Sequence, residues 1–147
     1  MIEHIYLDFP DDDCYKKYLL NLRWNRYVIC PFCGSFKNTK LGSTCRFHCN
    51  VCNTNYSLTI NTVMHDTKLE LRKWLITLHL YLNDEKLSYR RLSKLIKVNK
   101  NTAYRMINKL QYLFSKNRLT ILKISGLNKD AIEIMSLILL IDMRRKS

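Results

Sequence analysis

The sequence contains little glycine and proline, with 3 Gly and 2 Pro among 147 residues. This scarcity excludes a collagen-like chain and argues against a long disordered segment. Long apolar runs are also missing, because the most apolar stretch covers only residues 131–141 and includes Glu133. A membrane-spanning helix needs about 20 apolar residues, so we expect no membrane span. The N-terminus lacks the basic start and apolar run of a cleavable signal, which predicts a cytoplasmic protein.

Acidic residues are scarce as well, since 12 Asp and Glu stand against 25 Lys and Arg, for a formal net charge of +13. The two signs are segregated along the chain. Residues 1–13 carry five acids and no base, whereas residues 68–123 carry fourteen bases and three acids. A basic block on a folded segment predicts a polyanionic partner, most often nucleic acid.

The hydrophobic pattern predicts an α+β protein that is mostly α-helical. Apolar residues recur with helical spacing on both sides of residues 27–60, where short β-prone pieces alternate with cysteines and turn residues. The capping-box pattern from Thr67 to Glu70 predicts a helix that starts at Thr67. We expect helices over residues 11–24, 67–82, 88–97, 100–114 and 129–143, strands that include residues 27–29, 44–47 and 56–58, and a loop or short strand over residues 115–127.

Four of the six cysteines form two C-x-x-C pairs that are separated by 15 residues. Zinc prefers four tetrahedral soft ligands, and this spacing is typical of a zinc ribbon. We therefore expect one structural Zn²⁺ bound by Cys30, Cys33, Cys49 and Cys52. Redox-active pairs and unligated core thiols are the alternatives, but a redox motif needs only one such pair. Four protein ligands leave no open coordination position for catalysis.

The other cysteines and histidines show no ligand pattern. His48 adjoins Cys49 and is therefore poorly placed to share its metal, so we interpret His48 as a strand residue. Cys45 is interpreted as a packing residue near the second pair. Cys14 lies beside the apolar stripe of the first expected helix, which predicts a small, buried hydrophobic side chain.

Residues 88–110 have the pattern of a helix-turn-helix. Five apolar positions are spaced to pack two short helices across a tight turn, namely Leu92, Ile96, Val98, Ala103 and Met106. The second helix is expected to enter the major groove of double-stranded DNA. The candidate DNA contacts are Arg90, Arg91 and Lys94 on phosphates, and Lys100, Asn101, Tyr104, Arg105 and Asn108 on the second helix. The alternative is an ordinary helical hairpin with a solvated basic face, since the turn carries Lys97 where glycine is usual.

The expected C-terminal helix is apolar nearly all round, so it needs burial on more than one side. One interpretation is that it packs on the helix-turn-helix and also joins a second copy, which predicts a homodimer through this helix. The other is a decayed or frame-shifted remnant. The chain then divides into an N-terminal helix (1–26), a zinc ribbon (27–62), a helix-turn-helix domain (63–116) and a C-terminal tail helix (117–147).

The order of these parts resembles the N-terminal region of bacterial insertion-sequence transposases, which carry a zinc ribbon before a DDE-type nuclease. The matching pieces over residues 11–114 are Cys14 with Leu22-Arg-Trp24, then Cys30-Pro-Phe-Cys33-Gly34, then Phe47-His-Cys49-Asn-Val-Cys52, then the run from Tyr56 through Met64-His65 to Trp74, and finally the helix-turn-helix. The resemblance implies binding to the terminal inverted repeats of a transposon.

The resemblance stops before the catalytic domain, in which an acidic triad holds two divalent metals. Only 33 residues follow Phe114, and their acids are Asp130, Glu133 and Asp142. One helix cannot supply a two-metal carboxylate site, so we expect no enzymatic activity from this chain.

Together these patterns predict a sequence-preferring, double-stranded DNA-binding protein that acts as a regulator or accessory factor. Such a protein is expected at the nucleoid of a bacterial or phage-infected cell. A non-catalytic subunit or truncated remnant of a transposase is the second hypothesis. The third is a protein- or RNA-interaction module, which the absence of an evident aromatic platform for base stacking disfavours.

Overall fold

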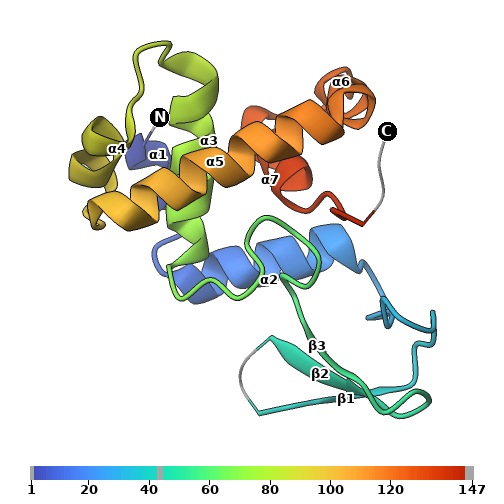
Figure 1. Ribbon diagram of the computed structural model, residues 1–147. Helices are drawn as coiled ribbons and strands as arrows, with labels where there is room; N and C mark the ends of the chain where they lie inside the picture. Colours follow the sequence, from blue (N-terminus) through green and yellow to red (C-terminus); the bar gives the residue numbers. More distant parts are fainter. Residues whose placement is uncertain (1, 43–44, 145–147) are drawn as a thin grey trace.

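The computed structural model describes residues 2–42 and 45–144. Over these residues the chain forms seven helices and one three-stranded antiparallel sheet, which confirms an α+β fold that is mostly helical. Figure 1 shows a body of helices with the sheet projecting below it. The helices are α1 (Ile2–Asp8), α2 (Asp12–Arg23), α3 (Leu71–Asn83), α4 (Tyr89–Ile96), α5 (Lys100–Lys116), α6 (Arg118–Ser125) and α7 (Ala131–Leu139), and the strands are β1 (Asn38–Lys40), β2 (Arg46–Cys49) and β3 (Asn55–Ser57).

Helix α3 is the centre of the helical body. It contacts α1, α2, α4, α5 and α7. Consecutive residues from Trp74 to Leu78 are all buried, so the helix is covered on nearly every side. A helix surrounded in this way draws most of its stability from tertiary packing rather than from intrinsic helix propensity.

Helix α7 brings the C-terminal part of the chain into the same core. Met135, Ile138 and Leu139 are buried, and α7 packs against α2, α3 and α6. The chain itself therefore buries one face of α7, whereas Ile132, Ile134 and Leu137 are half-buried, and the predicted homodimer through this helix stays a prediction. The helix ends earlier than the expected residue 143, because the chain then turns back and the Met143 N–H donates to the Asn61 carbonyl at 2.7 Å. No helix in the described ranges combines the length and apolar character required to cross a bilayer.

The ribbon, residues 25–60, has a small core of its own made of Cys30, Phe47, Cys49 and Tyr56. Helix α2 belongs to both cores. Tyr15 and Leu19 lie in the main core of the helical body. Leu20, further along the same helix, and Trp24, the C-cap residue that directly follows it, pack against the small core. Helix α2 is therefore the element that fixes the ribbon to the body.

The sheet is a meander in which β2 lies between β1 and β3. Phe47 on β2 pairs with Lys40 on β1 and with Tyr56 on β3. The expected strands over residues 44–47, whose first residue lies outside the described ranges, and 56–58 overlap β2 and β3. The expected strand over residues 27–29 is wrong, because the first strand is β1. The Val28 carbonyl instead accepts a hydrogen bond from Asn38 Nδ2 at 2.8 Å.

The expected capping box at Thr67 does not form, and α3 begins at Leu71. The Thr67 hydroxyl accepts hydrogen bonds from the Leu69 N–H at 3.2 Å and from Trp74 Nε1 at 3.1 Å. The Glu70 carboxylate accepts from the Arg72 guanidinium. Both capping side chains are thus engaged in other contacts, and threonine hydroxyls readily stabilise such local turns instead of a helix start.

Residues 118–125 form helix α6, where we expected a loop or short strand. Thr120, Ile121 and Ile124 are β-branched, which favours strands. The burial of Ile121 and the packing of α6 against α5 and α7 override this preference. The break between α5 and α6 occurs at the buried Asn117, which donates from Nδ2 to the Leu113 carbonyl at 3.2 Å. The short helix α1 was not expected.

Candidate metal centre and basic helix surface

The four cysteines of the two C-x-x-C pairs come together in the ribbon. Their sulfur atoms all lie within 4.8 Å of one another. Cys30 Sγ lies 3.6 Å from Cys52 Sγ, and Cys33 Sγ lies 3.5 Å from Cys49 Sγ. Zn–S bonds of about 2.3 Å in a tetrahedron place sulfur atoms about 3.8 Å apart. The donor set therefore fits one structural zinc ion, as predicted.

Each cysteine pair lies in the same kind of backbone turn. Four positions after the first cysteine, the backbone is left-handed, at Gly34 (φ 77°) and at Asn53 (φ 60°). The amide of this residue donates to the carbonyl of the first cysteine, at 2.9 Å for Gly34 and 3.0 Å for Asn53. Glycine adopts this conformation freely and asparagine tolerates it. The sequence pattern pointed to Gly34 as a turn residue but not to Asn53. Asn53 could have been found from the sequence, because it follows Cys49 at the same distance of four positions.

Hydrogen-bond donors point at the sulfur atoms. The Phe32 N–H donates to Cys30 Sγ at 3.4 Å, and the Cys52 N–H donates to Cys49 Sγ at 3.5 Å. The Cys52 amide lowers the pKa of the Cys49 thiol. The Thr54 hydroxyl oxygen accepts from Cys52 Sγ at 3.3 Å and its O–H donates to the Cys52 carbonyl at 3.4 Å; the contact with Thr54 lowers the pKa of Cys52 to about 6. Because zinc binds the thiolate, the lowered pKa values favour the form of Cys49 and Cys52 that holds the metal.

The small core couples the metal centre to helix α2. The Trp24 ring meets Phe47 and Tyr56 edge-on, with centroids 6.0 Å and 5.9 Å away. Cys30 and Cys49 are buried in this core, while Cys33 and Cys52 are exposed. Bound zinc would therefore link the two exposed cysteines to the two buried ones. We expect the folding of the small core and the binding of the metal to depend on each other.

The structure places the remaining candidate ligands outside the cluster. His48 lies on β2 as predicted, with Nδ1 2.6 Å from Asn55 Oδ1. Cys45 is half-buried and packs against the main core, which confirms its packing role. Cys14 is exposed, so the prediction of a buried side chain was wrong. The buried face of α2 runs through Tyr15 and Leu19 instead.

Helices α4 and α5 form a hairpin joined by residues 97–99, close to the expected boundaries. Both begin at a side-chain cap. Ser88 Oγ accepts from the Arg91 N–H at 3.1 Å, and Asn99 Oδ1 accepts from the Thr102 N–H at 2.8 Å. Such caps satisfy backbone donors that a helix start leaves unpaired. Of the apolar positions predicted to join the helices, Leu92, Ile96, Ala103 and Met106 are buried and Val98 is half-buried.

Lys97 closes helix α4 in a left-handed conformation, with φ 57° and ψ 54°. The Val98 N–H then donates to the Ser93 carbonyl at 3.1 Å, which is the bond expected when a left-handed residue ends a helix. The turn thus has the geometry that glycine normally provides, although lysine occupies it. Ser93 itself is buried, and its hydroxyl donates to the Arg90 carbonyl at 2.9 Å.

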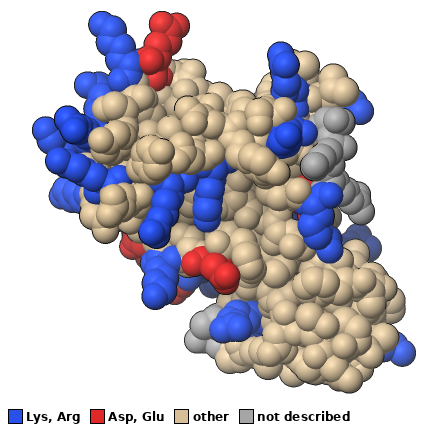
Figure 2. All heavy atoms as spheres, in the orientation of Figure 1, with Lys and Arg blue, Asp and Glu red and all other residues tan. Residues whose placement is uncertain are grey.

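All eight predicted DNA contacts are exposed: Arg90, Arg91, Lys94, Lys100, Asn101, Tyr104, Arg105 and Asn108. In Figure 2, Lys and Arg side chains gather over α4 and along α5. Tyr89, which sequence reasoning did not single out, orders part of this surface. Its ring meets the Tyr104 ring edge-on at 5.6 Å, and the Arg90 guanidinium lies 5.7 Å from its centroid. Arg91 Nε pairs with Asp84 Oδ2 at 2.8 Å.

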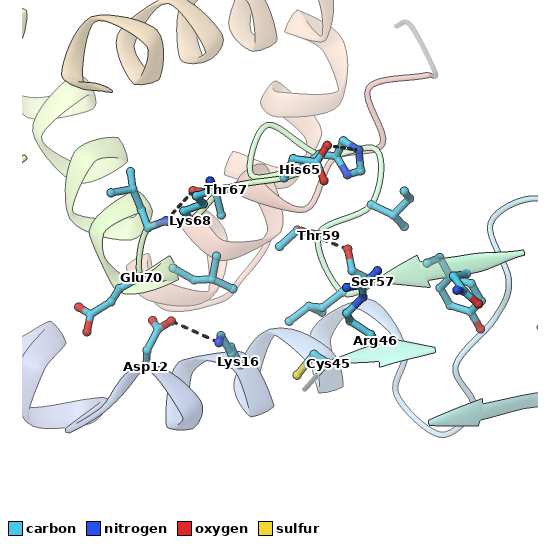
Figure 3. Close-up of a pocket in the computed structure, with 17 residues that line it drawn as sticks. Asp12, Lys16, Cys45, Arg46, Ser57, Thr59, His65, Thr67, Lys68 and Glu70 are labelled. Atoms are coloured by element: carbon cyan, nitrogen blue, oxygen red, sulfur yellow. Dashed lines mark hydrogen bonds and ion pairs between the residues drawn. The ribbon is translucent and has the colours of Figure 1, made fainter. Parts of the chain in front are cut away.

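A cleft of about 640 Å³ lies between the ribbon, α2 and the start of α3 (Figure 3). Its lining carries both charge signs. Lys16 Nζ lies 3.8 Å from Asp12 Oδ2, and His65 Nε2 lies 3.3 Å from Asp66 Oδ2. Acids therefore accompany the cations here, and the cleft does not extend the positive surface of α4 and α5.

Comparison with known proteins bears on the ribbon most directly. Residues 10–55 match the family described as the transposase zinc-ribbon domain, and this range includes α2 and all four clustered cysteines. A curated protein of Halobacterium salinarum, described as an uncharacterized protein in transposable element ISH50, is 29% identical over 94 residues. That alignment covers 62% of this chain and 32% of the relative, so the chain spans about a third of the relative's length. No solved structure gives a significant match. Residues 10–55 thus match a transposase zinc-ribbon domain, in a chain that is similar to a protein of a transposable element.

Proposed function

We propose that this chain binds double-stranded DNA with sequence preference, using the α4–α5 hairpin as a helix-turn-helix. The observation that carries the proposal is the exposure of eight basic or polar side chains on one hairpin whose opposite faces are buried. The match of residues 10–55 to a transposase zinc ribbon supports a DNA partner. The net charge of +13 supports a polyanionic one.

Helix α5 is the reading element in this proposal. Residues 104 and 105 lie three and four positions after residue 101, and residue 108 lies four and three positions after them, so the four side chains share one stripe of the helix. Arginine pairs with the major-groove edge of guanine, and asparagine with that of adenine. Arg105 and Asn108 are therefore the proposed base readers, and Lys100 and Tyr104 contact the backbone.

Helix α4 supplies the phosphate contacts. Arg90, Arg91 and Lys94 are exposed on it. Asp84 already pairs with Arg91 at 2.8 Å, which offsets part of its charge. In this proposal Lys94 therefore binds phosphate more strongly than Arg91 does.

The role we propose is that of a regulator or accessory factor of a mobile element, acting on DNA at the nucleoid. The relative in transposable element ISH50 supports the mobile-element context. A non-catalytic subunit of a transposase is the second candidate, and it is favoured by the zinc-ribbon match itself. A DDE-encoding reading frame beside inverted repeats, next to the gene for this chain, would favour that second role.

Selection on random duplex DNA tests the proposed function. The zinc-loaded protein is mixed with the random pool at two salt concentrations, and the bound DNA is sequenced. We expect one enriched motif at both concentrations, and a two-fold motif would indicate binding as a dimer. Salt-sensitive binding without any motif would contradict sequence preference, because it reports only electrostatic attraction to phosphates.

A further inference from the structure

Two aromatic side chains of the ribbon are exposed side by side. Tyr27 is 66% exposed and Phe36 is 64% exposed. Their ring centroids lie 5.7 Å apart, and the ring planes are tilted by 46°. Large apolar side chains on a surface are a common mark of an interaction site when they are adjacent rather than scattered. Neither ring belongs to the small core or the main core.

The backbone segments that carry these rings are held together by one side chain. Asn38 Nδ2 donates to the Val28 carbonyl at 2.8 Å and to the Phe36 carbonyl at 3.1 Å. The amide of Asn38 thus bridges the residue that follows Tyr27 and the residue that carries the second ring. A surface positioned in advance loses less conformational entropy when it binds a ligand.

The stretch of sequence that contains the pair carries charge of one sign. Between Asp13 and Asp66 the chain contains seven Lys and Arg and no Asp or Glu. Arg26 directly precedes Tyr27 and Lys37 directly follows Phe36, and both basic residues are exposed. A zinc ion with four thiolates contributes −2, which does not cancel the seven positive charges.

A ligand suited to this surface has flat rings that stack on Tyr27 and Phe36. It also has repeated negative charges that pair with Arg26 and Lys37. Unpaired nucleic acid has both, and its bases stack on aromatic side chains while lysine and arginine contact the phosphates. Bases inside a duplex are already stacked and do not offer their faces. We propose that Tyr27 and Phe36 form a stacking platform for unpaired bases of single-stranded DNA, with Arg26 and Lys37 on the flanking phosphates. The choice of DNA rests on the function proposed above.

Fluorescence anisotropy with the zinc-loaded full chain tests this platform. The probes are a labelled oligothymidine of about 12 nucleotides and a blunt duplex. We expect the double variant Tyr27→Ala with Phe36→Ala to bind the oligothymidine about tenfold more weakly or worse, and to bind the duplex as before. The aromatic exchanges Tyr27→Phe and Phe36→Tyr should retain binding. The control is Val51→Ala, which removes another exposed apolar side chain of the ribbon and should change neither affinity.

Three results would overturn the platform: unchanged oligothymidine binding by the double variant, an equal loss on the duplex, or tighter binding of wild type to oligouridine RNA. Zinc content, measured in every variant, shows whether the ribbon still folds.

An experiment on the wild type alone gives independent support. When 5-iododeoxyuridine replaces thymidine in the oligonucleotide, we expect its photocrosslinks to map to Tyr27 or Phe36. Crosslinks confined to α5 would contradict the proposal. A wild type that binds the oligothymidine but no duplex contradicts the proposed function and leaves this inference standing.

Discussion

The phenol oxygen of Tyr15 on α2 lies 2.8 Å from the hydroxyl oxygen of Ser136 on α7, at a separation of 121 residues along the chain. Both side chains are fully buried. Burial raises the pKa of Tyr15, so its hydroxyl stays protonated and available as a hydrogen-bond donor. Two buried hydroxyls that satisfy each other specify how their helices pack, since either one alone would lack a partner.

Removal of the Tyr15 hydroxyl should destabilise the helical body. We expect Tyr15→Phe to lower the free energy of unfolding by about 1–2 kcal/mol, because Ser136 loses its buried partner. The double variant with Ser136→Ala should lose less than the sum of the two single effects. Urea unfolding followed by circular dichroism measures these differences, and Tyr104→Phe on the exposed surface is the control. Additive effects would show that the two hydroxyls are not coupled.

Removal of zinc should unfold the ribbon and leave the helical body folded. The two cores share only partly buried residues, Leu20 and Trp24, and among the described residues the zinc ligands belong to the small core alone. With a chelator we expect the fluorescence of Trp24, which packs on Phe47 and Tyr56, to shift towards that of an exposed indole, while most helical circular dichroism remains. Cys49→Ser should abolish stoichiometric zinc, and Cys14→Ser, an exposed cysteine outside the cluster, should not. A single transition that removes both signals together would contradict two separable units.

Replacement of Lys97 by glycine should stabilise the protein, because the left-handed backbone at this position strains any residue with a Cβ. The strain is about 1–2 kcal/mol and is partly offset by the greater freedom of glycine in the unfolded chain, so the expected net gain is about 0.5–1 kcal/mol. Lys94→Gly, inside the same helix, is a matched control of opposite sign, with a loss of about 1 kcal/mol. Denaturant midpoints compare the two. A loss for Lys97→Gly as large as that for Lys94→Gly would reject the strain argument.

Two substitutions on the basic surface separate base reading from phosphate anchoring. Arg105→Ala should relax sequence preference, and Lys94→Ala should weaken binding to all sequences and lower the salt slope by about one ion. Lys123→Ala, an exposed position on α6, should leave both properties unchanged. Affinities for the selected motif and for a scrambled duplex, measured over a salt series, distinguish the effects. An equal loss on every sequence for Arg105→Ala would remove Arg105 from the reading face.

Acid should loosen the contact between the C-terminal segment and the ribbon. The Arg144 guanidinium hydrogen-bonds to Asp142 and lowers the pKa of that carboxyl, and Arg144 also donates to the Pro31 carbonyl at 2.9 Å. A lowered carboxyl pKa adds stability that is present above the unfolded value of about 3.9 and is lost as the pH falls through the folded value. Asp142→Asn should therefore flatten the loss of stability below about pH 4. Urea midpoints at a series of acid pH values measure this loss of stability. Parallel curves for the wild type and Asp142→Asn would contradict the role of Asp142.

The features that could be predicted from the sequence are those with local signals. Two cysteines at a fixed spacing specify their own turn, and two such turns predict a metal centre wherever the chain brings them together. The starts of α4 and α5 were predictable because Ser88 and Asn99 cap residues only three positions away. The roles of the eight side chains on α4 and α5 in binding DNA stay predictions.

The features that could not be predicted depend on contacts between distant residues. Helix α6 forms against the strand preference of its β-branched residues, because α5 and α7 cover Ile121. The Thr67 hydroxyl is used by Trp74 rather than by a helix start. The aromatic pair on the ribbon was not evident in the sequence, since Tyr27 and Phe36 are nine residues apart and the segments that carry them are joined by the hydrogen bonds of Asn38.

The long span between Tyr15 and Ser136 has a consequence for folding during synthesis. A ribosome delivers all four zinc ligands by residue 52, whereas α7 begins only at Ala131. Helix α3 needs α7 to cover one of its sides, so the helical core stays open until residues 131–139 have emerged. The ribbon can close around its metal well before that, because its own contacts are short in sequence. A nascent chain of this protein would thus carry a folded, zinc-bound ribbon before the core that supports the proposed duplex-binding surface has formed.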